Sequence, residues 1–409
     1  MGPYPIESLK RGSMPDLNSV APMKSLSFQR EEAPENIVNA MREYQAMMDA
    51  IRDGLVNKAT AQIPSDPQER ANHLKAFGYF CDASMVGICQ LPSTAILPRA
   101  IMNPDIESLA EALRTRQTKT LAAGIDMIMA DLKDSMEAPP TTIDEHNYAI
   151  IFLYENPRDI RKDEPGVDWL QDALFHRASL RANETAAVIA NYIRLLGYDA
   201  KSHSGSASDV DINQLAVASG LVWHEGNELV APYVGSNFGF SAVTCSIDLA
   251  IDHPLVPAKE QPWFKTKGPA WWLGMGFSKN ILNRDPYANR HFIDGAYPFE
   301  RLKRVDKPTT FIDEKNVSRV PKRADMFARA QFGDMGKTNQ EGAKGGHYAR
   351  KSAPSYAQRR ALGAFVLLQD GEPNIDGTRP SDAKRNAENI KATSYFLGID
   401  AVGISRCPD

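Results

Sequence analysis

The residues that could carry out chemistry in this chain are few and scattered. Cysteine thiolates can act as nucleophiles or ligate metals, but the four cysteines form no CxxC pair; they are Cys81, Cys89, Cys245 and Cys407. This spacing predicts free thiols in a reducing compartment, and it provides no iron–sulfur site, which needs four clustered thiolates. The eight histidines form neither HxH nor HxxxH, so the sequence predicts no metal site from neighbouring ligands.

Two adjacent pairs have the residue types of a general acid and a general base, namely Glu145-His146 and His224-Glu225. The first pair opens a predicted strand, and the second lies in the turn before one. We interpret both as solvated boundary pairs rather than as catalytic groups, because nothing in the sequence places a reacting proton within their reach.

Three short stretches bear on nucleotide binding or nucleophilic catalysis. GDMGKT at 333–338 resembles the end of a phosphate-binding loop, but Gln331 stands where that pattern needs a glycine, and a predicted helix precedes it. GMG at 274–276 lacks the third glycine of a dinucleotide fingerprint. The sequence SGS at 204–206 lacks the flanks of a nucleophile elbow. We therefore predict no catalytic residue and no metal ligand in this chain, and we assign no cofactor-binding residue.

Alternating periodicities predict the elements around these residues. Helices are predicted at 37–59, 70–80, 105–136, 168–196, 211–219, 325–332 and 354–368. Strands are predicted at 85–90, 146–154, 198–203, 229–234 and 240–249. Helices alternate with strands through short connections, so residues 70–257 read as one layered α/β domain.

Composition limits the classes of partner. The formal net charge is -4 and the isoelectric point is near 6.1, so the chain has no overall attraction to nucleic acid or to an acidic membrane. No apolar run reaches 18 residues and no export signal is visible, so we expect no membrane-spanning helix and a cytoplasmic location.

A 22-residue stretch occurs twice. Ala71–Pro92 returns as Ala387–Pro408 at a constant offset of 316 residues. Nine positions are identical, where roughly one or two would be expected between unrelated segments. Both stretches predict a helix with a Tyr-Phe pair, a turn and a strand x-Val-Gly-Ile-x. We interpret them as an internal repeat. Leu397 and Ser405 replace Cys81 and Cys89 in the second stretch, which favours small core residues over a catalytic thiol.

Residues 216–255 resemble the corrinoid-binding fold of the reductive dehalogenase and epoxyqueuosine reductase families. In those families a helix reading about A-x-x-A-G-L-G-x-x-G leads to a strand, a P-x-x-G turn and a strand ending in T-D-x-P-L. The matching residues are Ala216, Ala218, Gly220, Leu221, Gly226, Pro232, Gly235, Asp252, Pro254 and Leu255. Upstream, YFCDASMVGIC, NYAIIFLY and ANETAAVIANYIRLLGYDA follow in the family's order.

The chain also departs from the family pattern. Family members carry two ferredoxin-type cysteine runs after the T-D-x-P-L tail, whereas residues 256–406 contain no cysteine. The usual Gly-Leu-Gly reads Gly220-Leu221-Val222, and Gly226 falls one place late. The pattern is similar to the catabolic, oxygen-tolerant reductive dehalogenases, which carry a degenerate first copy of the fold and a second copy that holds cobalamin.

This resemblance implies an α+β or α/β layered architecture. We expect a nitroreductase-like cobalamin-binding fold, with a central mixed sheet flanked by helices, followed by a long irregular connection. On this interpretation residues 1–69 form an N-terminal arm and helix, and 70–257 form the degenerate copy. Residues 258–380 form the connection, which buries its tryptophans, and 381–409 begin the second copy.

The resemblance also implies a function for the complete enzyme. It would remove halide reductively from an organohalide, commonly an aromatic one, with cobalamin and two [4Fe–4S] clusters. We expect no cofactor in this chain itself and a scaffold role without activity. Two alternatives stay open: a stand-alone corrinoid-binding or scaffold protein, and a flavin enzyme of the nitroreductase type. A homodimer is one of three expected states of residues 386–404, beside packing on the first domain and a loose tail.

Overall fold

The computed structural model describes residues 5–115, 141–156, 159–226, 228–257, 260–261, 303, 305, 313–316, 326–343, 352–363, 365 and 382–405. The predictions for residues 116–140, for the GMG stretch and for most of the connection at 258–380 lie outside these ranges. So does Cys407.

A four-stranded sheet forms the centre of the molecule, in the order β1-β3-β8-β4. The strands are β1 (Met85–Gln90), β3 (Tyr148–Glu155), β8 (Phe238–Cys245) and β4 (Ala200–His203). The predicted helix-flanked α+β fold is confirmed. The prediction was of a mixed sheet, whereas the pairings that the described residues make are antiparallel throughout. The bounds of β1 agree with the prediction.

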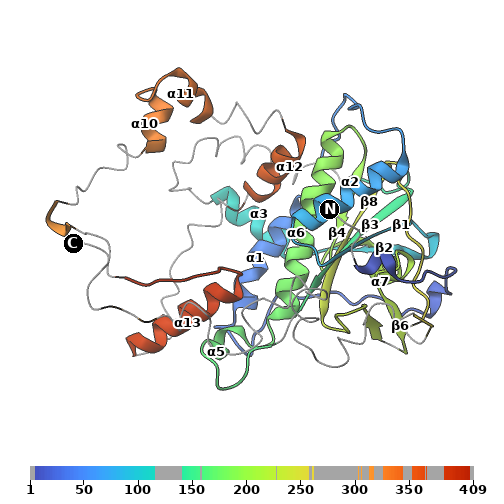
Figure 1. Cartoon of the computed structure of the whole chain (residues 1–409), viewed down its shortest axis with the longest axis horizontal. Helices are drawn as coiled ribbons and strands as arrows, with labels where there is room; N and C mark the ends of the chain where they lie inside the picture. The colour runs from blue at the N-terminus through green and yellow to red at the C-terminus, as the bar shows by residue number, and fades with distance from the viewer. Residues whose placement is uncertain are drawn as a thin grey trace.

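Strand β3 is buried on both faces, as its continuous apolar run predicts. Alternate side chains point to opposite sides, so Ile150, Phe152 and Tyr154 lie in one core cluster, and Ala149, Ile151 and Leu153 lie in the other. The long helix α6 (Leu174–Leu195) and helix α2 (Pro67–Phe80) cover the first face. The short helix α7 (Ile212–Ala218) covers the second. Figure 1 shows α6 running across the sheet.

Local chemistry explains where several helices begin and end. Asp211 caps α7 by accepting the backbone N–H groups of Asn213 and Gln214, so the predicted N-cap is confirmed. The single helix predicted at 168–196 is wrong: the chain forms α5 (Val167–Leu170) and then α6. The break lies at Asp172, whose positive φ of 55° does not fit a helix. Helix α1 spans Ile37–Ala50 and stops nine residues before the predicted end.

The remaining described elements are shorter. The helices are α3 (Asp105–Thr115), α10 (Met326–Phe332), α11 (Lys337–Ala343), α12 (Ala353–Leu362) and α13 (Ala383–Phe396). Two small sheets pair β2 (Ile96–Ile101) with β5 (Ser208–Val210) and β6 (Trp223–Glu225) with β7 (Glu228–Val230). Single 3-10 turns lie at Pro5–Ser8, Leu17–Ser19, Ser93–Ala95 and Glu314–Asn316.

The described part of the predicted N-terminal arm crosses the α7 face of the sheet. Ile6, Leu9, Leu17 and Val20 are each at most 6% exposed and belong to the core cluster around α7. The arm therefore supplies the outer wall of this half of the core. This explains why six of the seven residues of α7 are buried.

The end of the chain packs on the first domain through α13. Ala392 and Phe396 of this helix join a third core cluster with Leu170 of α5 and Met41 of α1. The strand expected at 401–405 is not formed, and Figure 1 shows that the chain after α13 leads away from the sheet toward the C-terminus. Residues 386–404 were expected to pack on the first domain, to dimerise or to stay loose. Helix α13 packs on the first domain.

Candidate functional site

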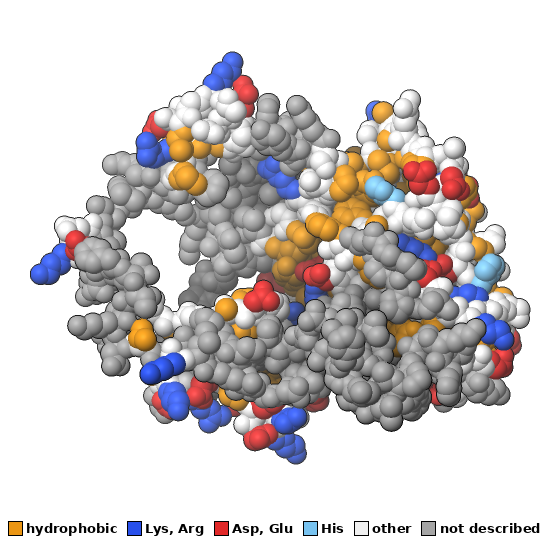
Figure 2. Space-filling view, in the orientation of Figure 1, with side chains coloured by type: hydrophobic (Ala, Val, Ile, Leu, Met, Phe, Trp, Pro, Cys, Tyr) orange, Lys and Arg blue, Asp and Glu red, His pale blue; other side chains and the backbone are white. Residues whose placement is uncertain are grey.

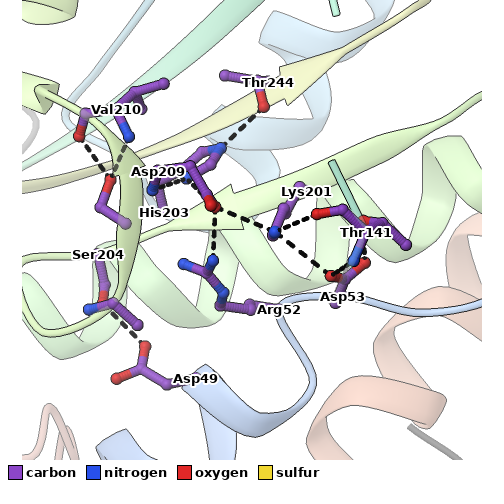
Figure 3. Close-up of polar contacts among 12 residues, drawn as sticks. Asp49, Arg52, Asp53, Thr141, Lys201, His203, Ser204, Asp209, Val210 and Thr244 are labelled. Atoms are coloured by element: carbon purple, nitrogen blue, oxygen red, sulfur yellow. Dashed lines mark hydrogen bonds and ion pairs between the residues drawn. The ribbon is translucent and has the colours of Figure 1, made fainter. Parts of the chain in front are cut away.

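Buried charges gather where α1 ends beside β4 and β5 (Figure 3). Lys201 of β4 is 1% exposed, and its Nζ donates to the backbone oxygen of Thr141 at 2.7 Å. The same Nζ lies 3.1 Å from Asp209 Oδ2 and 3.4 Å from Asp53 Oδ2. Arg52 also forms an ion pair with Asp209. Two cations thus face two carboxylates, which satisfies the rule that buried charges are paired.

A directional hydrogen-bond chain crosses the sheet next to these ion pairs. The backbone N–H of Asp209 donates to Nδ1 of His203, so the neutral ring carries its proton on Nε2. That Nε2 lies 2.8 Å from Oγ1 of Thr244, which in turn lies 2.8 Å from Nδ1 of His146. The threonine hydroxyl therefore accepts from His203 and contacts His146 through the same oxygen. His146 Nε2 then lies 3.3 Å from the carboxylate of Asp199.

This geometry keeps His203 neutral. Burial, together with the nearby charges of Arg52 and Lys201, holds the pKa of His203 well below its ordinary value. A hydrogen bond from His146 lowers the pKa of Asp199. The contacts therefore form a relay that runs from the neutral ring of His203 through Thr244 and His146 to the carboxylate of Asp199.

A second buried carboxylate lies on the other side of Arg52. Asp49 is 2% exposed, and burial raises the pKa of its carboxyl group. Five side chains donate hydrogen bonds to it at 2.6 to 3.0 Å: Gln45, Asn103, Asn183, Ser204 and Ser206. This arrangement joins helix α1, the loop after β2, helix α6 and the loop after β4 through one anion.

The arrangement can hold structure together, because its buried cations and carboxylates and the ring of His203 point at one another (Figure 3). Burial also raises the pKa of the Cys81 thiol to about 11 and that of the Cys245 thiol to about 12, which disfavours the reactive thiolate form of both. The free thiols predicted at Cys81, Cys89 and Cys245 are confirmed.

The structure corrects one prediction about these residues. We expected His146 to be solvated, but it is 5% exposed and belongs to the relay. Its partner Glu145 is exposed. In the second pair, Glu225 is exposed and accepts a hydrogen bond from Trp223 at 2.8 Å. The relay was missed because its members lie about 40 and 60 residues apart in sequence, and no local spacing joins them.

The two glycines of GDMGKT connect α10 to α11, with φ of +92° at Gly333 and +88° at Gly336. A helix precedes them, as expected, and this agrees with the rejection of a phosphate-binding loop. Among the described residues there is no group of three or more His, Cys, Asp or Glu that could hold a metal ion. No described helix is long and apolar enough to cross a membrane.

Part of the motif that carries the corrinoid-fold resemblance, around Gly220, is covered by the N-terminal arm. Arg11 of the arm donates to the backbone oxygens of Gly220 at 2.8 Å and His253 at 3.0 Å. A Cβ atom on Gly220 would lie 2.1 Å from the Arg11 guanidinium. The small residues Ala216 and Ala218 are fully buried beneath this contact.

An ion pair also holds the N-terminal arm in place. Lys75 of α2 is 7% exposed, and its Nζ lies 2.8 Å from Glu7 of the arm and 2.7 Å from Asp252. The other oxygen of Asp252 accepts the backbone N–H of Ile88 in β1 at 2.8 Å. Asp252 of the D-x-P-L tail thus links arm, helix and sheet. Asp252 belongs to the predicted motif, but its contacts with Lys75 and Ile88 were not predicted.

Comparisons with known proteins add to this geometry. No protein-family model and no curated protein matches the chain. Among solved structures, the catabolic reductive dehalogenase NpRdhA is 29% identical, with a TM-score of 0.71 over 98% of this chain. This chain has the fold of the catabolic reductive dehalogenases. The predicted resemblance to that family, which covered residues 70–257 and the tail from 381, is confirmed over nearly the whole chain.

Two further structures agree. NpRdhA in complex with 3-bromo-4-hydroxybenzoic acid has a TM-score of 0.67 at 29% identity over 96% of this chain. A reductive dehalogenase described as suggesting a mechanism for B12-dependent dehalogenation has a TM-score of 0.66 at 30% identity over 96%. The chain spans about half the length of these reductive dehalogenases, 51% in each case. An epoxyqueuosine reductase from Streptococcus thermophilus aligns with a TM-score of only 0.27, so a relation to that family stays a prediction.

Proposed function

We propose that this chain is the N-terminal scaffold part of a cobalamin-dependent reductive dehalogenase. In the complete enzyme, cobalamin would carry out the removal of halide from an organohalide, and two [4Fe–4S] clusters would deliver electrons. The solved relatives are described as reductive dehalogenases, one of them B12-dependent and another bound to a halogenated hydroxybenzoic acid. An aromatic organohalide is therefore the substrate class that we propose.

The observation that carries the scaffold role is the covered motif. Arg11 fills the space beside Gly220, and the nearby buried charges are paired with one another. Residues 70–257 are then a copy of the corrinoid-binding fold that has lost its ligand. Its remaining task is to hold the next unit of the protein.

Helix α13 is the part of the next unit that the first domain holds. The side-chain oxygen of Asn389 accepts the backbone N–H of Gly166 at 3.0 Å. Gly166 and Ala392 pack closely, since a Cβ atom added to Gly166 would lie only 2.9 Å from the Cβ atom of Ala392. Arg177 lies 5.2 Å above the ring of Phe396. We propose that residues 381–409 begin the second, cobalamin-holding copy, and that this interface sets its orientation.

The proposal is tested by chemical analysis of the purified chain. We expect no iron, no halide release from a brominated hydroxybenzoate with a strong reductant, and no spectral change on adding cobalamin or FMN. Iron at cluster stoichiometry or measurable halide release would contradict the scaffold role. A new spectrum with cobalamin would favour a stand-alone corrinoid protein, and one with FMN would favour a flavin enzyme. The gene beyond codon 409 should continue in frame into a cysteine-rich region.

The other predictions about partners belong to the same proposal. We propose a cytoplasmic protein with no nucleic-acid partner and no membrane partner. In the described part of the face that Figure 2 shows, basic and acidic side chains are interspersed, which supports the lack of such partners. A homodimer of the complete enzyme is compatible with the proposal and is tested by sedimentation of the purified protein.

A further inference from the structure

We propose that helix α12 and Phe365 form a clasp that closes over Glu184 of α6 and takes up a proton as it closes, so that acid strengthens it. The clasp is defined by these elements, residues 353–362 and 365. It lies near the end of the segment that connects the first domain to α13. The clasp concerns how this connection is held on the first domain, and it does not depend on the proposed function.

Helix α12 packs against α6 through small side chains and one polar contact (Figure 1). Ala357 and Ala361 are at most 2% exposed and belong to the core cluster that contains Ala186 of α6. The buried side chain of Asn191 in α6 donates to the backbone oxygen of Ala357 at 3.1 Å. Because a buried amide needs a hydrogen-bond partner, this contact fixes the position of α12 along α6.

Side chains of the clasp also reach α1 and the end of α2. The ring of Phe365 stacks on that of Tyr44 in α1, with the ring centroids 3.4 Å apart and the planes 9° apart. Gln358 of α12 donates through Nε2 to the sulfur of Cys81, the C-cap residue of α2, at 3.8 Å. The clasp therefore bridges three helices of the first domain and covers side chains that lie between them.

Glu184 of α6 is the acidic side chain beneath the clasp. Its carboxyl group is hydrogen-bonded to the hydroxyl of Tyr44, whose ring lies against Phe365. Burial raises the pKa of Glu184, which favours the neutral, protonated form of this side chain. Burial likewise raises the pKa of Tyr44. A neutral carboxyl group beside a neutral phenol is therefore the pair that the closed clasp favours.

The groups around Glu184 do not cancel this effect. Those that titrate or carry charge come from α1, the end of α2, β3 and α6, and they are Tyr44, Cys81, Tyr154, Arg177 and Arg181. The two arginines lower the pKa of Glu184, but burial outweighs them, because this pKa is raised overall. Each arginine also has another partner. Arg181 pairs with Asp82 at 3.0 Å, and Arg177 lies over the ring of Phe396.

The direction of the pH effect follows from these contacts. When the clasp is open, Glu184 meets water and has its ordinary pKa of 4.5. When the clasp is closed, the pKa of Glu184 is raised, so the closed form binds more protons than the open form. The free energy of opening α12 should therefore rise as the pH falls through the raised pKa, and it should level off below the ordinary value. Weak acid holds the clasp closed more firmly than neutral solution does.

Hydrogen exchange of α12 in the whole purified chain tests the clasp, with each rate corrected for the intrinsic effect of pH on exchange. We expect the protection of residues 356–362 to rise at least about threefold between pH 7.5 and pH 5.0. Glu184→Gln keeps a hydrogen-bonding side chain beside Tyr44 but cannot titrate, so it should protect α12 equally at both pH values. Glu107→Gln is the matched control at an exposed position of α3 and should keep the threefold rise.

A second variant tests the clasp without changing a titrating group. Phe365→Ala removes the ring that covers Tyr44, so it should open the clasp and move the pKa of Glu184 down toward its ordinary value. Carbon-13 NMR of the Glu184 carboxyl group follows this pKa in the unaltered chain and in the variant. Three outcomes would overturn the inference: equal protection of α12 at both pH values in the unaltered chain, a rise that persists in Glu184→Gln, and a pKa of Glu184 that Phe365→Ala leaves unchanged.

Discussion

Phe80 and Phe396 occupy equivalent positions in two helices with the same caps, yet Phe80 is 68% exposed and Phe396 is 2% exposed. Phe396 lies in the cluster formed by α1, α5 and the start of α6, beneath Arg177. Phe80 is the last residue of α2, and its ring contacts that of Phe77. The same residue in the same local structure therefore has a different energetic role in each segment.

The first prediction follows from this pair. Phe396→Ala should lower the opening free energy of α13 by ~3 kcal/mol, because it removes a fully buried aromatic side chain. Hydrogen exchange of residues 386–396 measures this directly. Phe80→Ala is the matched control and should change the protection of α2 by less than about 0.5 kcal/mol. Equal effects of the two substitutions would show that α13 is not docked through Phe396.

The second prediction concerns the covered motif. Gly220→Ala should destabilise the protein by about 3 kcal/mol or more, because its Cβ atom would collide with Arg11 and with the backbone oxygen of His253. Gly226→Ala is the control: φ is +68° at Gly220 and +64° at Gly226, and a Cβ atom at Gly226 meets nothing within 4 Å. The control should cost only ~1 kcal/mol of backbone strain. Urea unfolding measures both, and similar losses would mean that the arm does not fill this space.

The third prediction concerns pH. The pKa of His203 is lowered in the folded protein, so between its folded value and the ordinary value of 6.5 the unfolded chain binds a proton that the folded chain does not. The free energy of unfolding should therefore fall as the pH drops below 6.5, by up to about 1.4 kcal/mol per pH unit from this group. Urea unfolding at pH 7.5, 6.5 and 5.5 measures the slope. The buried carboxyl group of Asp49, whose pKa is raised, acts in the opposite direction, so the contribution of His203 is read from the difference to a variant that lacks the ring.

The control for this effect is His203→Gln, which removes the titrating ring and keeps a hydrogen-bonding side chain. This variant should be less stable at pH 7.5 and should show a shallower slope between pH 6.5 and 5.5. An unchanged slope would assign the acid sensitivity to other groups. Protonation of His203 is opposed by Arg52 and Lys201 on one side and by the N–H of Asp209 on its Nδ1.

The fourth prediction concerns Asp49. Asp49→Asn should destabilise the protein by ~3 kcal/mol, because the amide nitrogen faces donors that the carboxylate accepts from, including Ser204 and Ser206. The side chain keeps its size, so a cavity would not explain the loss. Asp144→Asn is the control at an exposed position and should change stability by less than about 0.5 kcal/mol. Thermal or urea unfolding at pH 7.5 compares the two.

The family resemblance and much of the secondary structure could be predicted from the sequence. The bounds of β1, the cap at Asp211 and the double burial of β3 depend on local patterns, which act over a few residues. The break at Asp172 was missed because the apolar periodicity continues across it. At the break, the backbone N–H of Asp172 donates to the side chain of Asp159, 13 residues earlier in the chain.

The site depended on tertiary structure. Residue spacing is enough to exclude a local cysteine, histidine or glycine pattern for cofactor chemistry, because such patterns are short-range. Only the folded chain brings His146 and His203 to one threonine, and only it places Arg11 against Gly220, 209 residues away. The sequence also determined that residues 71–92 and 387–408 are alike. Which face of a segment is buried depends on the elements that pack against it. The opposite buried faces of these two segments therefore follow from the packing of the folded chain and not from their own residues.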